Sequence, residues 1–392
     1  MTDQPKEGLR PVTIKEQSAI DEKRCLDVCP AAYCDYSIFS AEPSHPLVSE
    51  SFESKWGHIL EIWEGHATDE EIRYKGSSGG AITAISLYCI EQLGMEGALQ
   101  IAQDPIQPTR NHTTFSTSRN DLLAATGSRY SPASVCDKLT RISNAESPCV
   151  IVGKPAEIAA VRNLERTDDS FAAKLGITIS FFCAETPPSK ATDEMIKSMG
   201  ADPEKVIDLR YRGFGWPGHF APTLEGDTEP CAKRTYQESW AFLQKFRPWS
   251  THIWPDGAGE LADISCGDPW YEQPDGQNPG FSLVVARTRK GKEIIDGAIA
   301  SGYLKLTKAE PWKLEKSQLG LLDKKGSVWG RRLAMRLIGM PVTEFAGMDL
   351  FHCWKRLGFN AKLKSTFGTM RRLIQRKLYR PLQLESHQTR PR

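Results

Sequence analysis

The strongest constraint on the fold is the order of elements expected between residues 58 and 104. Residues 58–65 (HILEIWEG) alternate between apolar and polar side chains, a pattern that is typical of a strand. Residues 81–94 have the apolar spacing of a helix that Gly94 is placed to end, and residues 97–104 (GALQIAQD) predict the next strand. A strand–loop–helix–strand order indicates an α/β protein.

The same alternation continues in a second block, which opens with a short buried strand at residues 149–153 and a helix from residue 157. Further strand and helix patterns follow up to residue 304, so we expect an α/β fold with a mixed sheet. The expected parts are an N-terminal cap (1–56), a first domain (57–145), a second domain (146–330) and a basic helical tail (331–392).

Composition excludes several classes of function. The formal net charge is +1, so the chain as a whole shows no preference for nucleic acid. No apolar run approaches the roughly 20 residues that span a bilayer, and the N-terminus lacks a basic segment followed by an apolar one. We therefore expect a cytoplasmic protein. Ten cysteines are too few for a disulfide scaffold, which favours free thiols or metal ligands.

The loop of Ser77, Ser78, Gly79 and Gly80 stands between the first strand and the helix. Glycine lets a ligand approach the backbone, and free N–H groups at the start of a helix attract phosphate. The loop indicates a cradle for the pyrophosphate of a dinucleotide. The alternative is a helix cap with a tight turn before it.

Two later segments carry polar groups that could contact a ligand. Residues 212–218 (RGFGWPG) contain the letters of the dinucleotide-binding fingerprint, but Pro217 and the lack of a following helix pattern argue against it. A rigid turn with Arg212 and Trp216 suits an anion and a flat ring, and suits a structural turn equally well. Asp263 and Asp268 could bind ribose or ring nitrogens, transfer a proton, or cap their own turn.

Cysteine spacing gives little support for a metal site. Cys25, Cys29 and Cys34 do not have the radical-SAM spacing, and the sequence has no C-x-x-C, H-x-E or H-E-x-x-H pattern. We expect these three to be small buried residues in a compact loop and predict no metal ligands.

The C-terminal segment is basic, because residues 354–392 hold eleven Lys and Arg and one Glu. Apolar side chains recur there at three- to four-residue spacing, namely Leu363, Phe367, Met370, Ile374 and Leu378. This predicts a basic amphipathic helix. We expect it to dock on the domain with a solvated face. The alternative is a docking surface for an acidic electron carrier or an anionic membrane surface.

Six motifs occur in a characteristic order between about residue 25 and about residue 320. They are KGSSGG (75–80), GSRY (127–130), GKP (153–155), FC followed by TPPS (182–189), RGFGWPG (212–218) and PDGAGELADISCGDPW (255–270). In this order they resemble the coenzyme F420-reducing hydrogenase beta-subunit family, which also includes 7-hydroxymethyl chlorophyll a reductase. The resemblance implies that family's fold, its N- and C-terminal-type domains over 57–145 and 146–330, FAD, iron–sulfur clusters, and electron exchange with F420, ferredoxin or a related carrier. It also implies FAD contacts at Ser77, Ser78, Gly79, Gly80, Arg129, Lys154, Arg212, Asp263 and Asp268.

The chain departs from this family at its cluster cysteines. The family typically has G-K-P-C where this chain has Ala156, and R-C-x-x-C-P-D where Thr251 and Trp254 replace both cysteines. Of these positions only Cys183 remains, and a cubane cluster normally needs four thiolates. We therefore expect no iron–sulfur cluster in this chain. The alternative is a longer native protein with cluster cysteines upstream of Met1.

Together these features predict an FAD-dependent oxidoreductase without its own complete cluster. It would move electrons or hydride between a carrier (F420, ferredoxin or nicotinamide) and an unknown organic substrate. By residue type, Asp268 and His252 are the candidate proton donors. The alternative is a non-catalytic flavin-binding or scaffolding subunit of a redox complex, which the loss of three cysteines would also explain.

Overall fold

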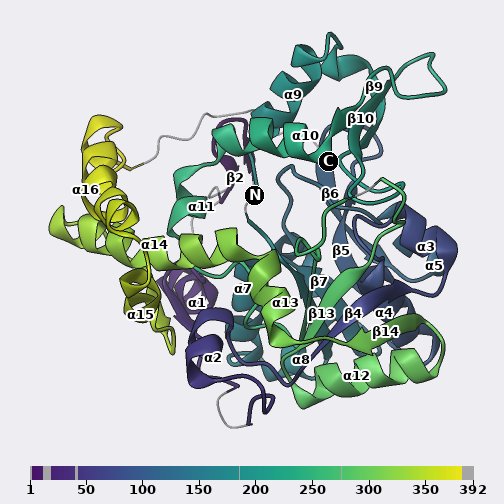
Figure 1. The fold of residues 1–392 in the computed structure, drawn as a ribbon, viewed down its shortest axis with the longest axis horizontal. Coiled ribbons are helices and arrows are strands. Elements are labelled where there is room, and N and C mark those ends of the chain that lie inside the picture. The colour runs from purple at the N-terminus through teal and green to yellow at the C-terminus, as the bar shows by residue number, and fades with distance from the viewer. Residues whose placement is uncertain (1, 12–18, 40–42, 185, 275, 382–392) are drawn as a thin grey trace.

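A computed structural model describes residues 2–11, 19–39, 43–184, 186–274 and 276–381. Its centre is an eight-stranded sheet with the strand order β14-β4-β13-β12-β8-β7-β5-β6 (Figure 1). In that order the strands are Leu304–Lys308, Glu61–Ala67, Ser282–Ala286, Ile264–Gly267, Leu175–Phe181, Cys149–Gly153, Ala98–Gln103 and Asn111–Ser116. The four strands β12, β8, β7 and β5 are parallel, and antiparallel strands flank them. The mixed α/β fold is confirmed.

Both faces of this sheet are covered, as the alternation along β7 shows. Val150 and Val152 belong to one core cluster, whereas Ile151 between them belongs to another. Successive side chains of a strand point to opposite faces, so each cluster lies on its own face. The first face carries α4 (Ala81–Glu91) and α12 (Arg289–Ala300), and the second carries α7 (Pro155–Glu165).

Shorter helices surround the sheet. They are α1 (Ala19–Val28), α2 (Glu50–Trp56), α3 (Glu70–Lys75), α5 (Arg119–Ala124), α6 (Thr140–Ser143), α8 (Asp169–Ala172) and α11 (Trp249–Ile253). Near the N-terminus, β1 (Thr2–Gln4) and β2 (Gly8–Arg10) form a hairpin. Cys34 is buried as expected, but Cys29 is half-buried and Cys25 is exposed, so the expectation of three buried cysteines is wrong for Cys25.

A smaller unit is inserted between β8 and β12 and lies at the top of Figure 1. It contains β9 (Val206–Arg210), β10 (His219–Leu224), β11 (Arg234–Thr235), α9 (Ser189–Ser198) and α10 (Tyr236–Leu243). The unit has its own core, formed by residues such as Met195, Phe220 and Leu243. The RGFGWPG segment is the turn between β9 and β10, so no helix follows it.

The large sheet also crosses the division between the two domains expected from the sequence. Strand β4, from the first expected domain, pairs with β13 and β14 from the second. The expected start of the tail at residue 331 falls inside α14 (Leu319–Leu337), which follows α13 (Pro311–Ser317). Strand β15 (Glu344–Ala346) then pairs with β3 (Tyr33–Asp35), which brings a segment near the N-terminus beside one after α14.

The last helices among the described residues are α15 (Leu350–Lys355) and α16 (Phe359–Gln375), which lie beside α14 at the left of Figure 1. The predicted helix is present and docked. Its buried residues, however, are Ser365, Thr366, Thr369 and Leu373 rather than the apolar series that defines the sequence pattern. Among the described residues, no helix combines the length and apolar character needed to cross a bilayer.

Candidate functional site

A cavity of about 240 Å³ opens at the carboxyl ends of the parallel strands β7, β8 and β12. Its lining includes Val152, Phe181 and Gly267 from these strand ends. The start of α4, the inserted unit and the segment from Ala125 to Ser131 contribute further walls, together with Gln318 and Leu321 at the start of α14. In open α/β sheets, ligands bind outside the carboxyl ends of the strands, so the position itself favours a binding site.

The start of α4 presents backbone to this cavity. Gly80 precedes the helix with φ at +73°, and no side chain of a described residue caps the first turn. Gly80, Ala81, Ile82 and Thr83 line the cavity. Uncapped N–H groups at the start of a helix carry partial positive charge and bind anions. This wall is therefore suited to a phosphate group.

Close packing behind the loop explains its two glycines. A Cβ added at Gly79 would lie 2.6 Å from the carbonyl oxygen of Gly65, and one at Gly80 would lie 2.7 Å from that of Ile72. The hydroxyl of Ser282 accepts from the Gly79 N–H at 2.9 Å and also contacts the Ser78 hydroxyl. The loop is thus held from behind while its other side remains part of the cavity wall.

Arg212 joins the inserted unit to this loop. Its guanidinium donates to both carboxylate oxygens of Asp268, at 2.8 and 2.6 Å, and to the carbonyl oxygens of Ser77 and Pro217. The indole of Trp216 donates to Asp268 at 3.0 Å. Burial disfavours the charge of Arg212, but Asp268 outweighs this effect and holds the pKa of Arg212 above its ordinary value. Arg212 therefore stays charged in the wall.

Six of the described lining residues are aromatic, and three of them, Tyr236, Trp240 and Trp270, come from α10 and the segment after β12. The rings of Tyr236 and Trp270 stack with centroids 5.0 Å apart and planes 11° apart, and the guanidinium of Arg212 lies 4.6 Å from the centre of the Tyr236 ring. Burial raises the pKa of the Tyr236 hydroxyl, which keeps it neutral. A wall of this kind suits a flat organic ring.

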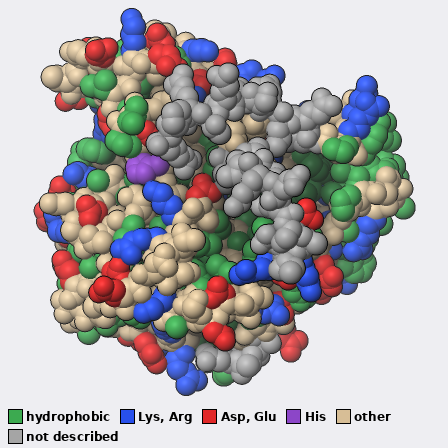
Figure 2. Space-filling view, turned by 180° about the vertical axis from the view of Figure 1, so that it is seen from behind, with side chains coloured by type: hydrophobic (Ala, Val, Ile, Leu, Met, Phe, Trp, Pro, Cys, Tyr) green, Lys and Arg blue, Asp and Glu red, His purple; other side chains and the backbone are tan. Residues whose placement is uncertain are grey.

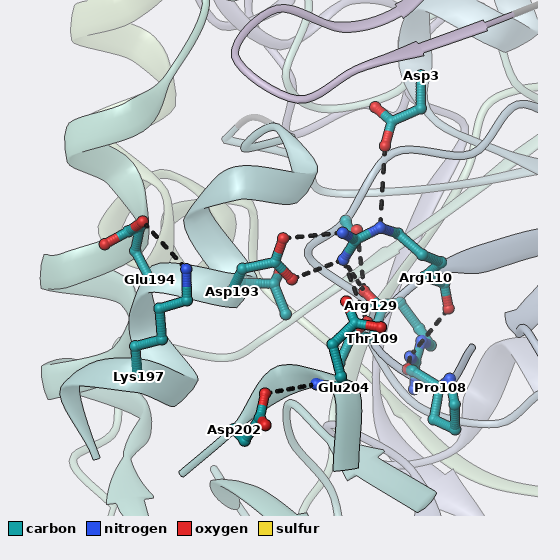
Figure 3. A network of polar contacts seen from close by, with 12 residues as sticks. Asp3, Pro108, Thr109, Arg110, Arg129, Asp193, Glu194, Lys197, Asp202 and Glu204 are labelled. Atoms are coloured by element: carbon teal, nitrogen blue, oxygen red, sulfur yellow. Dashed lines mark hydrogen bonds and ion pairs between the residues drawn. The ribbon is translucent and has the colours of Figure 1, made fainter. Parts of the chain in front are cut away.

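Lys154 and Arg129 reach the cavity with their polar groups already engaged. The ammonium of Lys154 donates to the carbonyl of Ala133 at 2.7 Å and pairs with Glu157. Burial works against its charge, and Glu157 raises the pKa of Lys154 above its ordinary value. Arg129 donates to the side chains of Asn111 and Gln103 and to several backbone carbonyls, including that of Pro108 (Figure 3). Both residues therefore add positive charge to the cavity wall while their donors are bonded to other protein groups.

The lining as a whole is electropositive. Among the described residues that form it, Arg129, Lys154 and Arg212 are cationic and Asp268 is the one acid. Hydroxyl groups of Ser77, Thr83, Ser128 and others add hydrogen-bonding capacity. These donors fit an anionic ligand with a flat ring, and FAD is such a molecule.

Three of the residues expected in the site, namely Asp263, His252 and Gly79, lie outside this lining. Asp263 is buried beneath β8, where its carboxylate accepts from Thr178 and pairs with Arg162 at 3.0 Å. His252 lies on α11, and its carbonyl accepts from Arg331. Gly79 lies just behind the cavity surface, and the other expected residues meet at the cavity.

Sequence reasoning missed Tyr236 and Trp240, although they form a wall of the cavity. They lie on α10, a short helix with no motif that points to a ligand. Trp270, by contrast, is the last residue of the GDPW sequence at the end of β12. Its closeness to Asp268, an expected site residue, could have indicated that it lies in the site. Only the inserted unit's position brings α10 to the strand ends.

Comparison with known protein families finds two matching models, both for the coenzyme F420 hydrogenase/dehydrogenase beta subunit. Residues 62–140 match the model of its N-terminal part. Residues 148–311 match the model of its C-terminal part. The two matched regions include the loop before α4, Arg212 and Asp268.

Individual relatives and one solved structure agree with these models. The chain is 26% identical over 293 residues to the coenzyme F420 hydrogenase subunit beta of Methanococcus voltae, covering 73% of this chain and 99% of that protein. It is 24% identical over 302 residues to the coenzyme F420-dependent sulfite reductase of Methanocaldococcus jannaschii, covering 73% of this chain and 42% of that protein. A chain of the F420-reducing NiFe hydrogenase complex from Methanosarcina barkeri matches with a TM-score of 0.57 and 20% identity, over 77% of this chain and 98% of that one, which shows the shared fold.

Proposed function

Because the chain belongs to the coenzyme F420 hydrogenase/dehydrogenase beta subunit family, whose F420-linked redox subunits bind FAD and iron–sulfur clusters, we propose that it is an FAD-dependent oxidoreductase. It transfers electrons or hydride between a carrier and an organic substrate. Both named relatives above act with coenzyme F420, which favours F420 over ferredoxin or a nicotinamide as the carrier. The proposal also places the protein in the cytoplasm.

The uncapped start of α4 in an electropositive cavity is the observation that carries this proposal. The N–H groups of Ala81, Ile82 and Thr83 would hold the diphosphate of FAD. Arg129, Lys154 and Arg212 would add a favourable electrostatic potential, since each is cationic and at least partly buried. Tyr236, Trp240 and Trp270 would contact flat rings.

The protein's own side chains have defined parts in this scheme. Bound FAD supplies a ring that accepts hydride or single electrons. Arg212 keeps a fixed positive charge in the wall, and the aromatic residues exclude water beside it. Both carboxylate oxygens of Asp268 are used by Arg212, so its contacts favour a positioning role over proton transfer. His252 stays a prediction by residue type.

We further propose that the chain has no complete iron–sulfur cluster of its own. At the positions where the family's cysteines are expected, Trp254 packs edge-on against Phe345 at 5.5 Å and the Thr251 hydroxyl donates to the carbonyl of Pro248. Ala156 lies in the first turn of α7. Across the described residues, no group of three or more His, Cys, Asp or Glu side chains is arranged to hold a metal ion.

The first test is to purify the protein without oxygen, record its visible spectrum, release the cofactor and assay iron. We expect about one FAD per chain and no iron. About four irons per chain would contradict the cluster-free proposal. A colourless protein that also fails to take up added FAD would instead favour a scaffolding role in a redox complex, since a scaffold needs no ligand in this cavity.

A matched pair of variants tests the position of the diphosphate. Thr83 lies in the first turn of α4 and lines the cavity. Thr83→Glu places a negative charge where a helix tolerates it well but where it repels a phosphate. We expect at least a tenfold loss of FAD affinity by fluorescence titration. Thr83→Gln has nearly the same shape without the charge, and it should keep most of the affinity. Equal losses in both variants would argue against a phosphate at this position.

A further inference from the structure

The C-terminal helix α16 docks with its small side chains and exposes its large ones. Ser365, Thr366 and Thr369 are buried against α14. Contact is close, because a Cβ added at Gly330 of α14 would lie 2.3 Å from the Ser365 hydroxyl. The face that docks is therefore selected by the close approach of the two helices, and the bulkier apolar side chains are left on the outside.

Four of these outer side chains form one stripe, which we call the α16 stripe. Phe359 is 75% exposed, Leu363 39%, Phe367 65% and Ile374 55%. Their spacing of four, four and seven residues places them on one side of the helix. Single exposed apolar residues are ordinary on protein surfaces, but a contiguous apolar row marks an interaction surface.

Positive charge surrounds this stripe. Residues 350–381 contain nine Lys and Arg and no Asp or Glu. Lys364 and Arg371 are exposed and follow the edge of the stripe on α16, and Lys355, the last residue of α15, and Arg356, the next residue, are also exposed. Seen from behind, the edge of the molecule where α16 lies shows hydrophobic side chains next to Lys and Arg (Figure 2). The surface thus offers apolar groups and cations together.

We propose that α16 binds the surface of an anionic lipid membrane. The helix is about 25 Å long and would lie parallel to the membrane, with the stripe among the acyl chains and the Lys and Arg at the headgroup phosphates. Each cation near an anionic membrane surface adds favourable free energy. This inference does not depend on the proposed redox function, because α16 lies beyond the residues that match the family models.

A lipid surface fits these observations better than an acidic protein. An acidic carrier would pair with the Lys and Arg side chains, but its charged surface would leave Phe359 and Phe367 without an apolar partner. The arrangement corresponds to a protein that lies on a membrane rather than one that spans it.

Vesicle sedimentation of the full-length protein tests the proposal. We expect the protein to sediment with vesicles of 70% phosphatidylcholine and 30% phosphatidylglycerol and to remain in solution with pure phosphatidylcholine. Phe359→Ser/Phe367→Ser should weaken the partition at least tenfold, because it removes the two most exposed rings of the stripe. Ile106→Ser is the matched control, since Ile106 is 93% exposed in the loop between β5 and β6, and it should change nothing.

A charge variant completes the test. Lys364→Gln/Arg371→Gln should weaken binding several-fold, and added salt should reduce the difference between it and the unaltered protein. Each variant should fold normally, as judged by circular dichroism, because every replaced side chain is exposed. No sedimentation with anionic vesicles, or sedimentation that the double serine variant leaves unchanged, would overturn the proposal. Capture of an immobilised acidic ferredoxin in place of the vesicles would also overturn it.

Discussion

Arg212 shows how one buried charge organises the wall of the cavity. Its side chain is 3% exposed, and it connects the β9–β10 turn to Asp268 after β12 and to the loop before α4. These three segments are far apart in the sequence. A guanidinium can join them because its donors lie in one plane and reach several acceptors at once.

Removing the carboxylate of Asp268, the partner of Arg212, should destabilise the folded protein. Asp268→Asn leaves Arg212 buried without its counter-ion, so we expect the free energy of unfolding to fall by about 3 kcal/mol. Urea denaturation of the flavin-free protein measures this change. Asp296→Asn breaks the pair of Lys292 and Asp296, whose side chains are 40% and 48% exposed, and should cost less than about 0.5 kcal/mol. Similar losses for the two variants would show that the buried pair contributes no more than a surface pair.

Glu260 gives the protein a specific pH dependence. Burial raises the pKa of Glu260 to about 7, although Lys325 at 2.9 Å and Arg287 act in the opposite direction and Asp256 adds to the rise. An unfolded chain releases this proton near pH 4.3. Between these values the folded state holds a proton that the unfolded state has lost. The stabilisation is therefore complete below about pH 4.3 and is lost as the pH rises through about 7.

The Glu260→Gln variant tests this dependence, because the amide has no proton to release. We expect the free energy of unfolding of the unaltered protein to fall relative to the variant between pH 5 and pH 8, by at most about 1.4 kcal/mol per pH unit. Urea titrations across this range measure the difference. Glu315→Gln, at the partly exposed partner of Lys55, should keep the slope of the unaltered protein. A constant difference between the Glu260→Gln variant and the unaltered protein at every pH would contradict the raised pKa.

At the scale of elements, the start of α4 and the docking of α16 show two ways in which a helix is positioned. Helix α4 is fixed at its N-terminus, where glycine backbone packs against Gly65 and Ile72. Helix α16 is fixed along one side, where hydroxyl side chains meet a glycine of α14. Hydrophobic periodicity predicts both helices, but it predicts the buried face of α4 only. The face of α16 that is buried carries small residues instead of large apolar ones, because α16 lies very close to α14.

Two glycines that flank α4 provide a matched comparison. Gly80 and Gly94 both have left-handed φ, at +73° and +66°. A Cβ at Gly80 would lie 2.7 Å from the carbonyl oxygen of Ile72, whereas one at Gly94 meets nothing within 4 Å. Gly94→Ala should therefore lower the free energy of unfolding by about 1 kcal/mol, because only the left-handed backbone conformation opposes the new side chain. Gly80→Ala should lower the free energy of unfolding by at least about 2 kcal/mol more, since the loop must move to relieve the clash with Ile72.

Urea denaturation measures both glycine variants, and FAD titration adds a second readout. Gly80→Ala should also weaken FAD binding, because the displaced loop forms the cavity wall, whereas Gly94→Ala should leave binding intact. Equal stability losses in the two variants would show that the contact with Ile72 relaxes without cost. Equal FAD affinities would show that the loop does not contact the cofactor.

On the scale of the whole molecule, the cavity depends on two units that fold around separate cores. The large sheet supplies the strand ends and the start of α4, and the inserted unit supplies Arg212 and α10. A ligand that contacts both units stabilises the arrangement in which they meet, to an extent that grows with its concentration relative to its dissociation constant. Because of this coupling, ligand binding at α4 should also stabilise the inserted unit.

Amide hydrogen exchange measures this coupling. Saturating FAD should slow exchange in α10, because Tyr236 and Trp240 line the same cavity as the first turn of α4. At a FAD concentration near the dissociation constant of the unaltered protein, the Thr83→Glu variant should show much weaker protection of α10, although its substitution lies on α4 and not in the inserted unit. Protection confined to α4 in the unaltered protein would mean that the inserted unit takes no part in binding.

The sequence by itself determined the family and most elements of the large sheet, although strands β6 and β14 were not predicted. Strand and helix periodicity are local properties, so β5, β7, α4 and α7 were predictable within a few residues. Motifs such as GSSGG and RGFGWPG also marked most of the cavity, because close backbone approach and rigid turns demand particular residues. Local pattern could not order the strands, nor show that one sheet continues across both expected domains.

Only the tertiary structure decided which polar and apolar side chains face the cavity, the core or solvent. Asp263 and Asp268 are five residues apart, yet one is buried against Thr178 of β8 and the other reaches the cavity, because the whole of β12 lies between them and places them at its opposite ends. Tyr236 and Trp240 become part of the site only when the inserted unit meets the strand ends. The α16 stripe faces solvent because the opposite side of α16, with its small hydroxyl side chains, packs closely against Gly330 of α14. In each case the outcome depends on contacts between distant segments, which spacing along one segment does not encode.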